Sequence, residues 1–156
     1  MLRADVVVLE STGLVARINS LRASYGLREL SVSSRLTGAA SRHADSLASA
    51  GYFRHELYTP TRSVRWTPYG TWIRWYYPGP GFSSWSAGEN LAWGAPDLAS
   101  RSAVTRWMAS PGHRENLLAP GWRQVGVAIV HASNPIGYFG TWEDVTIVIA
   151  EFGRRS

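Results

Sequence analysis

The stretch Ser110-Pro111-Gly112-His113-Arg114-Glu115-Asn116-Leu117-Leu118 places a histidine directly after a Pro-Gly break. Proline lacks an amide donor and clashes with the preceding helical turn, so a helix that comes before Pro111 must stop there. The apolar pair Leu117 and Leu118 follows closely and can anchor the turn to a core. We therefore expect the His113 imidazole to be held at a helix end, where it can serve as a ligand or a general base.

Two stretches further upstream carry the remaining candidate residues. One is Gly51-Tyr52-Phe53-Arg54-His55, which follows a predicted helix stop, and the other is Gly88-Glu89-Asn90-Leu91-Ala92-Trp93-Gly94. Two imidazoles and a carboxylate can bind a divalent metal ion, or they can act as base and acid around a substrate. We take His55, Glu89 and His113 as the candidate site, although their spacing in the sequence does not by itself bring them together.

The three stretches, in this order, resemble motifs of the CAP superfamily (SCP/TAPS), in particular its bacterial, cysteine-free branch. The motifs are Gly-Tyr-Phe-x-His, Gly-Glu-Asn-Leu-Ala and Trp-x-x-Ser-Pro-Gly-His-Arg-x-Asn-Leu-Leu, and the likeness runs from about Leu14 to Gly153. It implies an α+β fold, a three-layer α-β-α sandwich with a central, mostly antiparallel sheet. It also implies that His55, Glu89 and His113 line one cleft.

The resemblance further implies a set of two histidines and two acids in this cleft, and it implies that divalent metals, zinc among them, bind there. His55 and His113 would be metal ligands, together with Glu89. The second acid of relatives is expected three residues after the Trp of the last motif, where this chain has Ser110. Glu56 or Glu115 could substitute for it, but nothing in the sequence requires this.

Length and composition indicate a globular protein. The chain has 156 residues, 45% of them apolar and 17% charged, which suits one domain over residues 1–156 with a core at about residues 14–153. All 16 basic residues are Arg and the net charge is +5. This charge reflects either a composition bias or attraction to an anionic cell-envelope component. No basic run exceeds two residues, so we expect no nucleic-acid partner.

The absence of cysteine excludes disulfides and thiolate chemistry. The longest early apolar run, Val6 to Leu9, is too short for a signal-peptide core or a membrane span. We therefore expect no transmembrane segment and no signal peptide within this chain. The family resemblance nevertheless implies a secreted or cell-envelope protein.

Apolar periodicity predicts the regular elements. We expect a lead without helix, then three helices, with Gly26 and Gly51 as stop signals and Asp97 as the N-cap of the third. His43 falls on the apolar stripe of the second helix, where it is expected to pack in the core. The predicted ranges are residues 1–10 for the lead, 11–26, 33–50 and 97–109 for helices, and 124–132, 138–142 and 145–152 for strands, the last buried on both faces.

Residues 56–86 differ from the rest because they hold nine of the 19 aromatic residues and show no persistent period. We interpret them as a long ordered loop that can contain short helical or strand pieces. Its aromatic residues form either a satellite cluster over the core or a surface for an apolar ligand. The ligand-binding candidates are Trp66, Trp72, Trp75, Tyr76 and Trp85.

Three functions stay open at this point. The first is binding of an apolar or amphipathic small molecule, such as a lipid, a sterol-like compound or a cell-wall fragment, next to His55, Glu89 and His113. The second is a metal-dependent hydrolase or peptidase that uses the same cleft. The third is a non-catalytic protein-interaction module. Asn90 and Asn116 are expected to tie loop backbone through side-chain hydrogen bonds.

Overall fold

The computed structural model describes residues 3–61 and 65–156, and it describes the side chains of the first helix from Leu9 onward. The helices are α1 (Arg3–Ser24), α2 (Ser34–Ala50), α3 (Tyr69–Trp72), α4 (Ser100–Ala109) and α5 (Pro111–Leu118), with 3-10 turns η1 (Ile73–Trp75) and η2 (Gly137–Phe139). The strands are β1 (Ser31–Val32), β2 (Leu57–Tyr58), β3 (Trp66–Thr67), β4 (Trp85–Gly94), β5 (Gln124–Ser133) and β6 (Asp144–Arg155).

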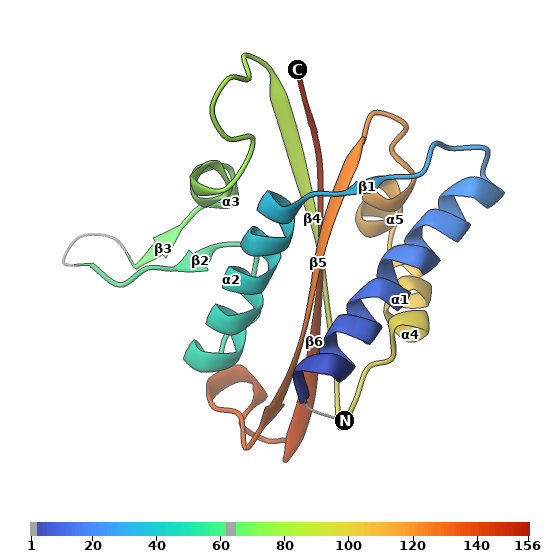
Figure 1. The fold of residues 1–156 in the computed structure, drawn as a ribbon. Coiled ribbons are helices and arrows are strands. Elements are labelled where there is room, and N and C mark those ends of the chain that lie inside the picture. The colour runs from blue at the N-terminus through green and yellow to red at the C-terminus, as the bar shows by residue number, and fades with distance from the viewer. Residues whose placement is uncertain (1–2, 62–64) are drawn as a thin grey trace.

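A four-stranded sheet in the order β1-β5-β6-β4 forms the middle layer. β6 pairs antiparallel with both β4 and β5, whereas β1 pairs parallel with β5. Helix α2 covers one face, and α1, α4 and α5 cover the other (Figure 1). The expected three-layer α-β-α sandwich with a mostly antiparallel sheet is therefore confirmed.

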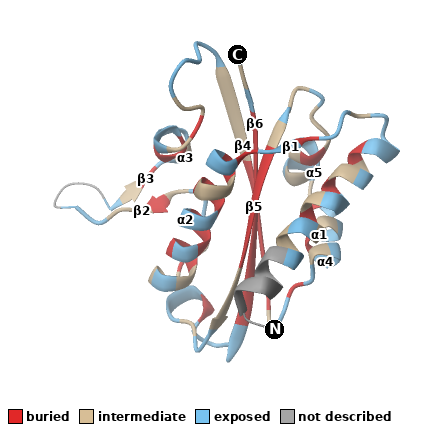
Figure 2. Cartoon of the chain, in the orientation of Figure 1, coloured by how far each residue is buried: buried red, intermediate tan, exposed pale blue. Residues whose placement is uncertain are grey.

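Alternation along the strands divides the core between the two faces. Val125, Val127 and Ile129 of β5 pack with α1, α4 and α5, whereas Ala128 packs with α2. Buried residues concentrate along the sheet (Figure 2). Residues 145–153 of β6 are all buried, which confirms that both faces of this strand are covered.

Helix α2 has the limits that its end signals predict. The Ser33 side chain accepts a hydrogen bond from the Leu36 amide, and Gly51 ends the helix in the left-handed region at φ 66°. A Cβ at Gly51 would lie 2.5 Å from the Ile136 carbonyl oxygen, so glycine is required here for space as well as conformation. This cap directs the chain from α2 into the stretch that carries His55.

Two helix predictions were wrong. Helix α1 begins at Arg3, so residues 3–10 are helical rather than a lead without helix; residues 1–2 lie outside the described part. Asp97 does not cap α4, because its Oδ1 accepts hydrogen bonds from the Leu98 amide and from the Thr146 hydroxyl of β6. The side chain is thus directed to the sheet, and α4 begins only at Ser100.

The strand predictions were right for β5 and β6 and wrong elsewhere. Residues 138–142, expected as a strand, lie in the connection between β5 and β6, where residues 137–139 form the 3-10 turn η2. β4 was not predicted, because the Gly-Glu-Asn stretch breaks its apolar pattern. The aromatic segment holds β2, β3, α3 and η1 before β4 begins at Trp85.

Candidate functional site

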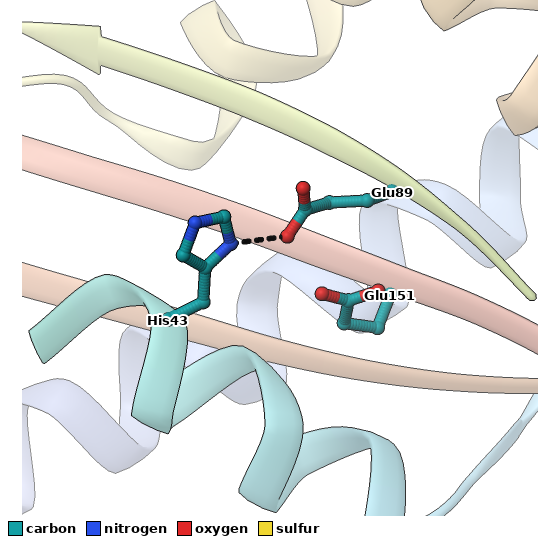
Figure 3. Close-up of side chains that lie close together, drawn as sticks. All are labelled: His43, Glu89 and Glu151. Carbon is teal, nitrogen blue, oxygen red and sulfur yellow. Dashed lines mark hydrogen bonds and ion pairs between the residues drawn. The ribbon is translucent and has the colours of Figure 1, made fainter. Parts of the chain in front are cut away.

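Glu89 of β4 forms the centre of the candidate site. Its Oε2 lies 2.5 Å from His43 Nδ1 of α2, and its Oε1 lies 2.7 Å from His55 Nδ1 (Figure 3 shows the first pair). Burial would raise the pKa of Glu89, but the hydrogen bonds from His43 and His55 outweigh it and lower that pKa. Glu89 is therefore an ionised acceptor, and each histidine donates its Nδ1–H to it.

His55 is the member of this group that reaches the surface. Its side chain is 52% exposed, whereas the Glu89 side chain is almost fully buried. The hydrogen bond with Glu89 raises the pKa of His55 against the opposing effect of partial burial. The Trp72 indole donates to the His55 carbonyl at 3.0 Å. With Nδ1 held by Glu89, it is Nε2 of His55 that is left for an external partner.

Glu151 of β6 is a second buried acid, and the sequence analysis missed it. It pairs directly with Glu89 across β6 and β4, and the Tyr69 hydroxyl donates to its Oε2 at 2.7 Å. Burial and the charge of Glu89 raise the pKa of Glu151 well above its usual range. Glu151 is therefore protonated beside an ionised Glu89. Burial, followed by the neighbouring acids Glu151 and Glu89, raises the pKa of Tyr69. An acid inside the apolar run of β6 was the available sequence signal.

His113 lies in the first turn of α5, after Pro111, as its helix-end prediction required. Burial, followed by the charge of His55, lowers the pKa of His113, so this imidazole is neutral near neutral pH. The Asn90 amide donates to the His113 carbonyl at 2.9 Å. The charge of His55 therefore acts on His113, and the grouping of His55, Glu89 and His113 in one cleft stays a prediction.

Asn116 completes the link between the two motifs. Its amide donates to the Glu89 carbonyl at 3.2 Å and to Asn90 Oδ1 at 3.1 Å. The expectation that Asn90 and Asn116 tie backbone segments together is confirmed. These bonds fix α5 against β4, so the positions of Glu89 and His113 depend on each other.

The second acid does not come from the positions considered in the sequence. Ser110 lies between α4 and α5 and carries no carboxylate, and Glu115 is exposed. Glu56 contributes only through its charge, which adds to the raised pKa of His55. The acid next to Glu89 is Glu151, because the antiparallel register of β4 and β6 brings the two carboxyl groups together.

The residues His55, Glu89 and His113 do not offer a complete set of ligands for a divalent metal ion. Both oxygens of Glu89 already accept histidine N–H groups, so Glu89 orients His55 and is not free to bind an ion. The accessible donors are the imidazoles of His55 and His113, whereas a catalytic zinc site has three protein ligands. We find that these residues do not fit a complete zinc site.

A second group, His43, Glu89 and Glu151, offers three possible ligand atoms within 4.8 Å of one another, and Glu151 Oε1 has no hydrogen-bond partner (Figure 3). However, ligands of one tetrahedral zinc ion lie about 3.3 Å or more apart. His43 Nδ1 and Glu89 Oε2, at 2.5 Å, are hydrogen-bonded instead. This buried group fits a shared proton better than a metal ion.

The predicted aromatic residues have different positions. Trp72 is fully buried beneath His55, so in this structure it cannot offer its ring to a ligand. Trp75 is 57% exposed, and Trp66, Tyr76 and Trp85 are partly buried. The segment does form a satellite cluster, built on Trp72 and its neighbours Ile73 and Tyr77.

Arginine side chains cover two of the partly exposed rings. The Arg54 guanidinium carbon lies 4.2 Å from the centre of the Trp66 ring, and that of Arg74 lies 5.3 Å from the Trp85 ring. Arg54 directly precedes His55 in the chain. The surface beside His55 therefore combines aromatic area with positive charge.

The three-layer sandwich and the buried Glu89 that binds His43 and His55 describe the class of protein to which this chain belongs. The sequence profile of the family described as "CAP: Cysteine-rich secretory protein family" matches residues 15–143. The chain belongs to this family.

Comparisons with individual proteins agree. The curated relative YkwD of Bacillus subtilis is 29% identical over 121 residues, covering 78% of this chain and 42% of YkwD, so this chain spans less than half of that protein. An outer surface protein of Borrelia burgdorferi has the same fold, with a TM-score of 0.71, 22% identity, and coverage of 94% of this chain and 93% of that one. An extracellular SCP-domain protein of Bacillus anthracis has a TM-score of 0.70 and 21% identity over 96% of this chain and 41% of that one.

Proposed function

We propose that this CAP domain acts outside the cytoplasm, secreted or held in the cell envelope, and binds an amphipathic ligand that carries negative charge. Two of its relatives are described as extracellular or outer-surface proteins. No helix in the described residues is long and apolar enough to cross a membrane. The proposed ligand is an anionic lipid or a cell-wall fragment with an anionic group.

The Arg54–Trp66 pair beside His55 is the observation that carries this proposal. Trp66 rests on Tyr52 and Tyr58, with ring centres 4.8 and 5.2 Å away, so its ring is held in place. Arg54 lies over the ring, and the raised pKa of His55 favours a second positive charge next to it. A fixed ring with two cationic neighbours suits a ligand with an apolar body and an anionic group.

Calorimetric titration of a soluble, short-chain phosphatidylglycerol tests this site, with the matching phosphatidylcholine as the zwitterionic comparison. We expect saturable binding of the anionic lipid, reduced about tenfold in Arg54→Gln through the loss of a charged contact. Arg101→Gln on α4 is the control, because it removes the same charge from an exposed position on the opposite face of the sheet. Equal losses in both variants would show only a net-charge effect and would refute the site.

Hydrolysis is the second candidate function, and the geometry of His55 is the observation that favours it. A histidine whose Nδ1–H is held by a buried carboxylate presents Nε2 as a general base in its neutral form, which the raised pKa of His55 moves to higher pH. Peptide or ester hydrolysis by wild type that disappears in His55→Gln but persists in Arg54→Gln would support an enzyme. Activity that survives His55→Gln would exclude this role for His55.

A further inference from the structure

In the described part of the chain, the outer edge of β5 has no strand partner beyond its short pairing with β1, and Val127 and Ile129 on this edge are each 4% exposed. Ser31 and Val32 pair with Gln124 and Val125, and the chain then turns into α2. Over residues 3–61 and 65–156, no strand pairs with this edge after Val125. An open edge presents backbone N–H and C=O groups that have no partner in the sheet.

The direction of these groups follows from the β1 pairing. The Ser33 amide donates to the Val125 carbonyl, so the backbone groups of Val125 face outward. Residues two apart in a strand have their N–H and C=O groups on the same side. Val127 and Ile129 therefore also direct their backbone groups to the open edge.

A groove of about 700 Å³ runs along this edge, between α1 and α2. Figure 1 shows the elements that flank it, with α2 on the left, α1 on the right and β5 between them. Residues of β5 from Val127 to Val130 line it, a length of about 14 Å at the rise of a strand. At its far end His131 Nε2 lies 2.8 Å from Glu10 Oε2, which joins β5 to α1. The groove therefore accommodates an extended segment of about four residues.

The two walls differ in chemistry. The wall from α1 consists of Val15 and Ala16 together with the hydroxyl residues Ser11 and Thr12, and the wall from α2 is a polar stripe of Thr37, Ser41 and Asp45 at four-residue intervals. Asp45 is the charged residue among those that line the groove. A strand laid beside β5 directs alternate side chains to the two walls. Apolar side chains would face Val15 and Ala16 of α1, and polar or basic ones would face the stripe of α2 that ends at Asp45.

We propose that this groove binds an extended peptide segment, which adds to the sheet as a strand beside β5 and alternates apolar with polar or basic residues. A fatty acyl chain would leave the outward groups of Val127 and Ile129 without partners, which is costly for backbone in an apolar groove. A second copy of this fold would bring its own α1 and α2 against these walls. A free extended segment meets neither obstacle.

The probe is an N-acetylated, C-amidated hexapeptide in which valine alternates with threonine and arginine. Its positive charge disfavours unspecific attraction to a chain of net charge +5. We expect saturable binding, and amide exchange at Val127 and Ile129 that slows at least about tenfold, whereas Val148 in the covered strand β6 serves as the reference. Methylation of the two peptide amides that face β5 should weaken binding about tenfold each, because it removes hydrogen bonds without changing side chains.

Substitutions at exposed positions of α1 and α2 test whether the peptide binds in this groove or elsewhere on the surface. Ala16→Trp fills the groove from α1 and should weaken peptide binding about tenfold or more. Ser49→Trp on α2 lies outside the groove and is the matched control. Asp45→Arg should weaken the arginine-containing peptide and spare one with threonine in its place.

Three results would overturn the proposal. The first is undiminished binding of the N-methylated peptide, and the second is unchanged exchange at Val127 and Ile129 with peptide present up to about 1 mM. The third is binding of laurate that Ala16→Trp abolishes while the peptide does not bind, which would identify an acyl-chain groove. None of the substituted positions belongs to the Arg54–Trp66 pair, so lipid binding at that pair is measured independently.

Discussion

Replacing Glu151 with Gln tests the buried proton at the centre of this domain. Glu151 shares the interior with an ionised Glu89 and accepts a hydrogen bond from Tyr69. Gln has nearly the same shape, its carbonyl can accept from Tyr69, and its amide can donate to Glu89. The change therefore preserves the contacts and removes only the ability to ionise.

The expected effect follows from proton linkage. In the folded protein the raised pKa keeps Glu151 protonated, whereas in the unfolded chain it ionises above its usual pKa. Wild type therefore loses about 1.4 kcal/mol of stability per pH unit relative to the variant, for as long as the folded protein keeps that proton. Between about pH 5 and about pH 7 the variant should gain up to roughly 3 kcal/mol over wild type, with near equality at about pH 4.5.

Urea unfolding followed by circular dichroism, at several pH values over this interval, measures the difference in free energy of unfolding. Glu115→Gln is the control, because it neutralises an exposed acid. A Glu151→Gln variant whose stability changes with pH in parallel with wild type would show that Glu151 is not the protonated member of the pair. A variant less stable than wild type at every pH would show that the amide does not fit the site.

Four further predictions concern the buried hydrogen bonds, the packing of α2 on β5 and the binding of zinc. In Glu89→Gln the pKa of His55, followed by NMR, should fall, and an unchanged titration would contradict the 2.7 Å contact as its cause. Stability should also drop by about 2–4 kcal/mol at neutral pH, a loss that shrinks as acid protonates wild-type Glu89, whose pKa is lowered. Gly126→Ala should cost about 3 kcal/mol or more or prevent folding, because its Cβ would lie 2.1 Å from a backbone nitrogen of α2; a thermal melt like that of wild type would refute this contact. Asn116→Ala should lower the free energy of unfolding by about 1–3 kcal/mol, compared with no loss for exposed Ser49→Ala. Calorimetry should detect no zinc site tighter than about 10 µM near neutral pH, since two accessible imidazoles are fewer ligands than zinc prefers, and tighter binding would reveal a further ligand.

Local signals in the sequence were sufficient for several features. The limits of α2 follow from Ser33 and Gly51, because a capping hydroxyl and a left-handed glycine act within one helical turn. The break at Pro111 places His113 at the start of α5 for the same reason. The continuous apolar run of β6 indicated that helices cover both faces of the sheet.

The remaining features depend on contacts between segments that are far apart in the chain. Glu151 became part of the site only through the register of β4 and β6, and His43 turned out to bond Glu89 rather than to serve as packing alone. Aspartate is a residue type that favours helix N-caps, but the Asp97 side chain accepts a hydrogen bond from the Thr146 hydroxyl of β6 instead. The edge of β5 has no strand partner after Val125 because β1 ends after two residues, and the groove forms because α1 and α2 lie on either side of this edge. Sequence alone determined the elements whose energetics are local. The pairing of the buried acids Glu89 and Glu151 and the groove required the tertiary structure, because both arise from the pairing order of strands and not from any one stretch.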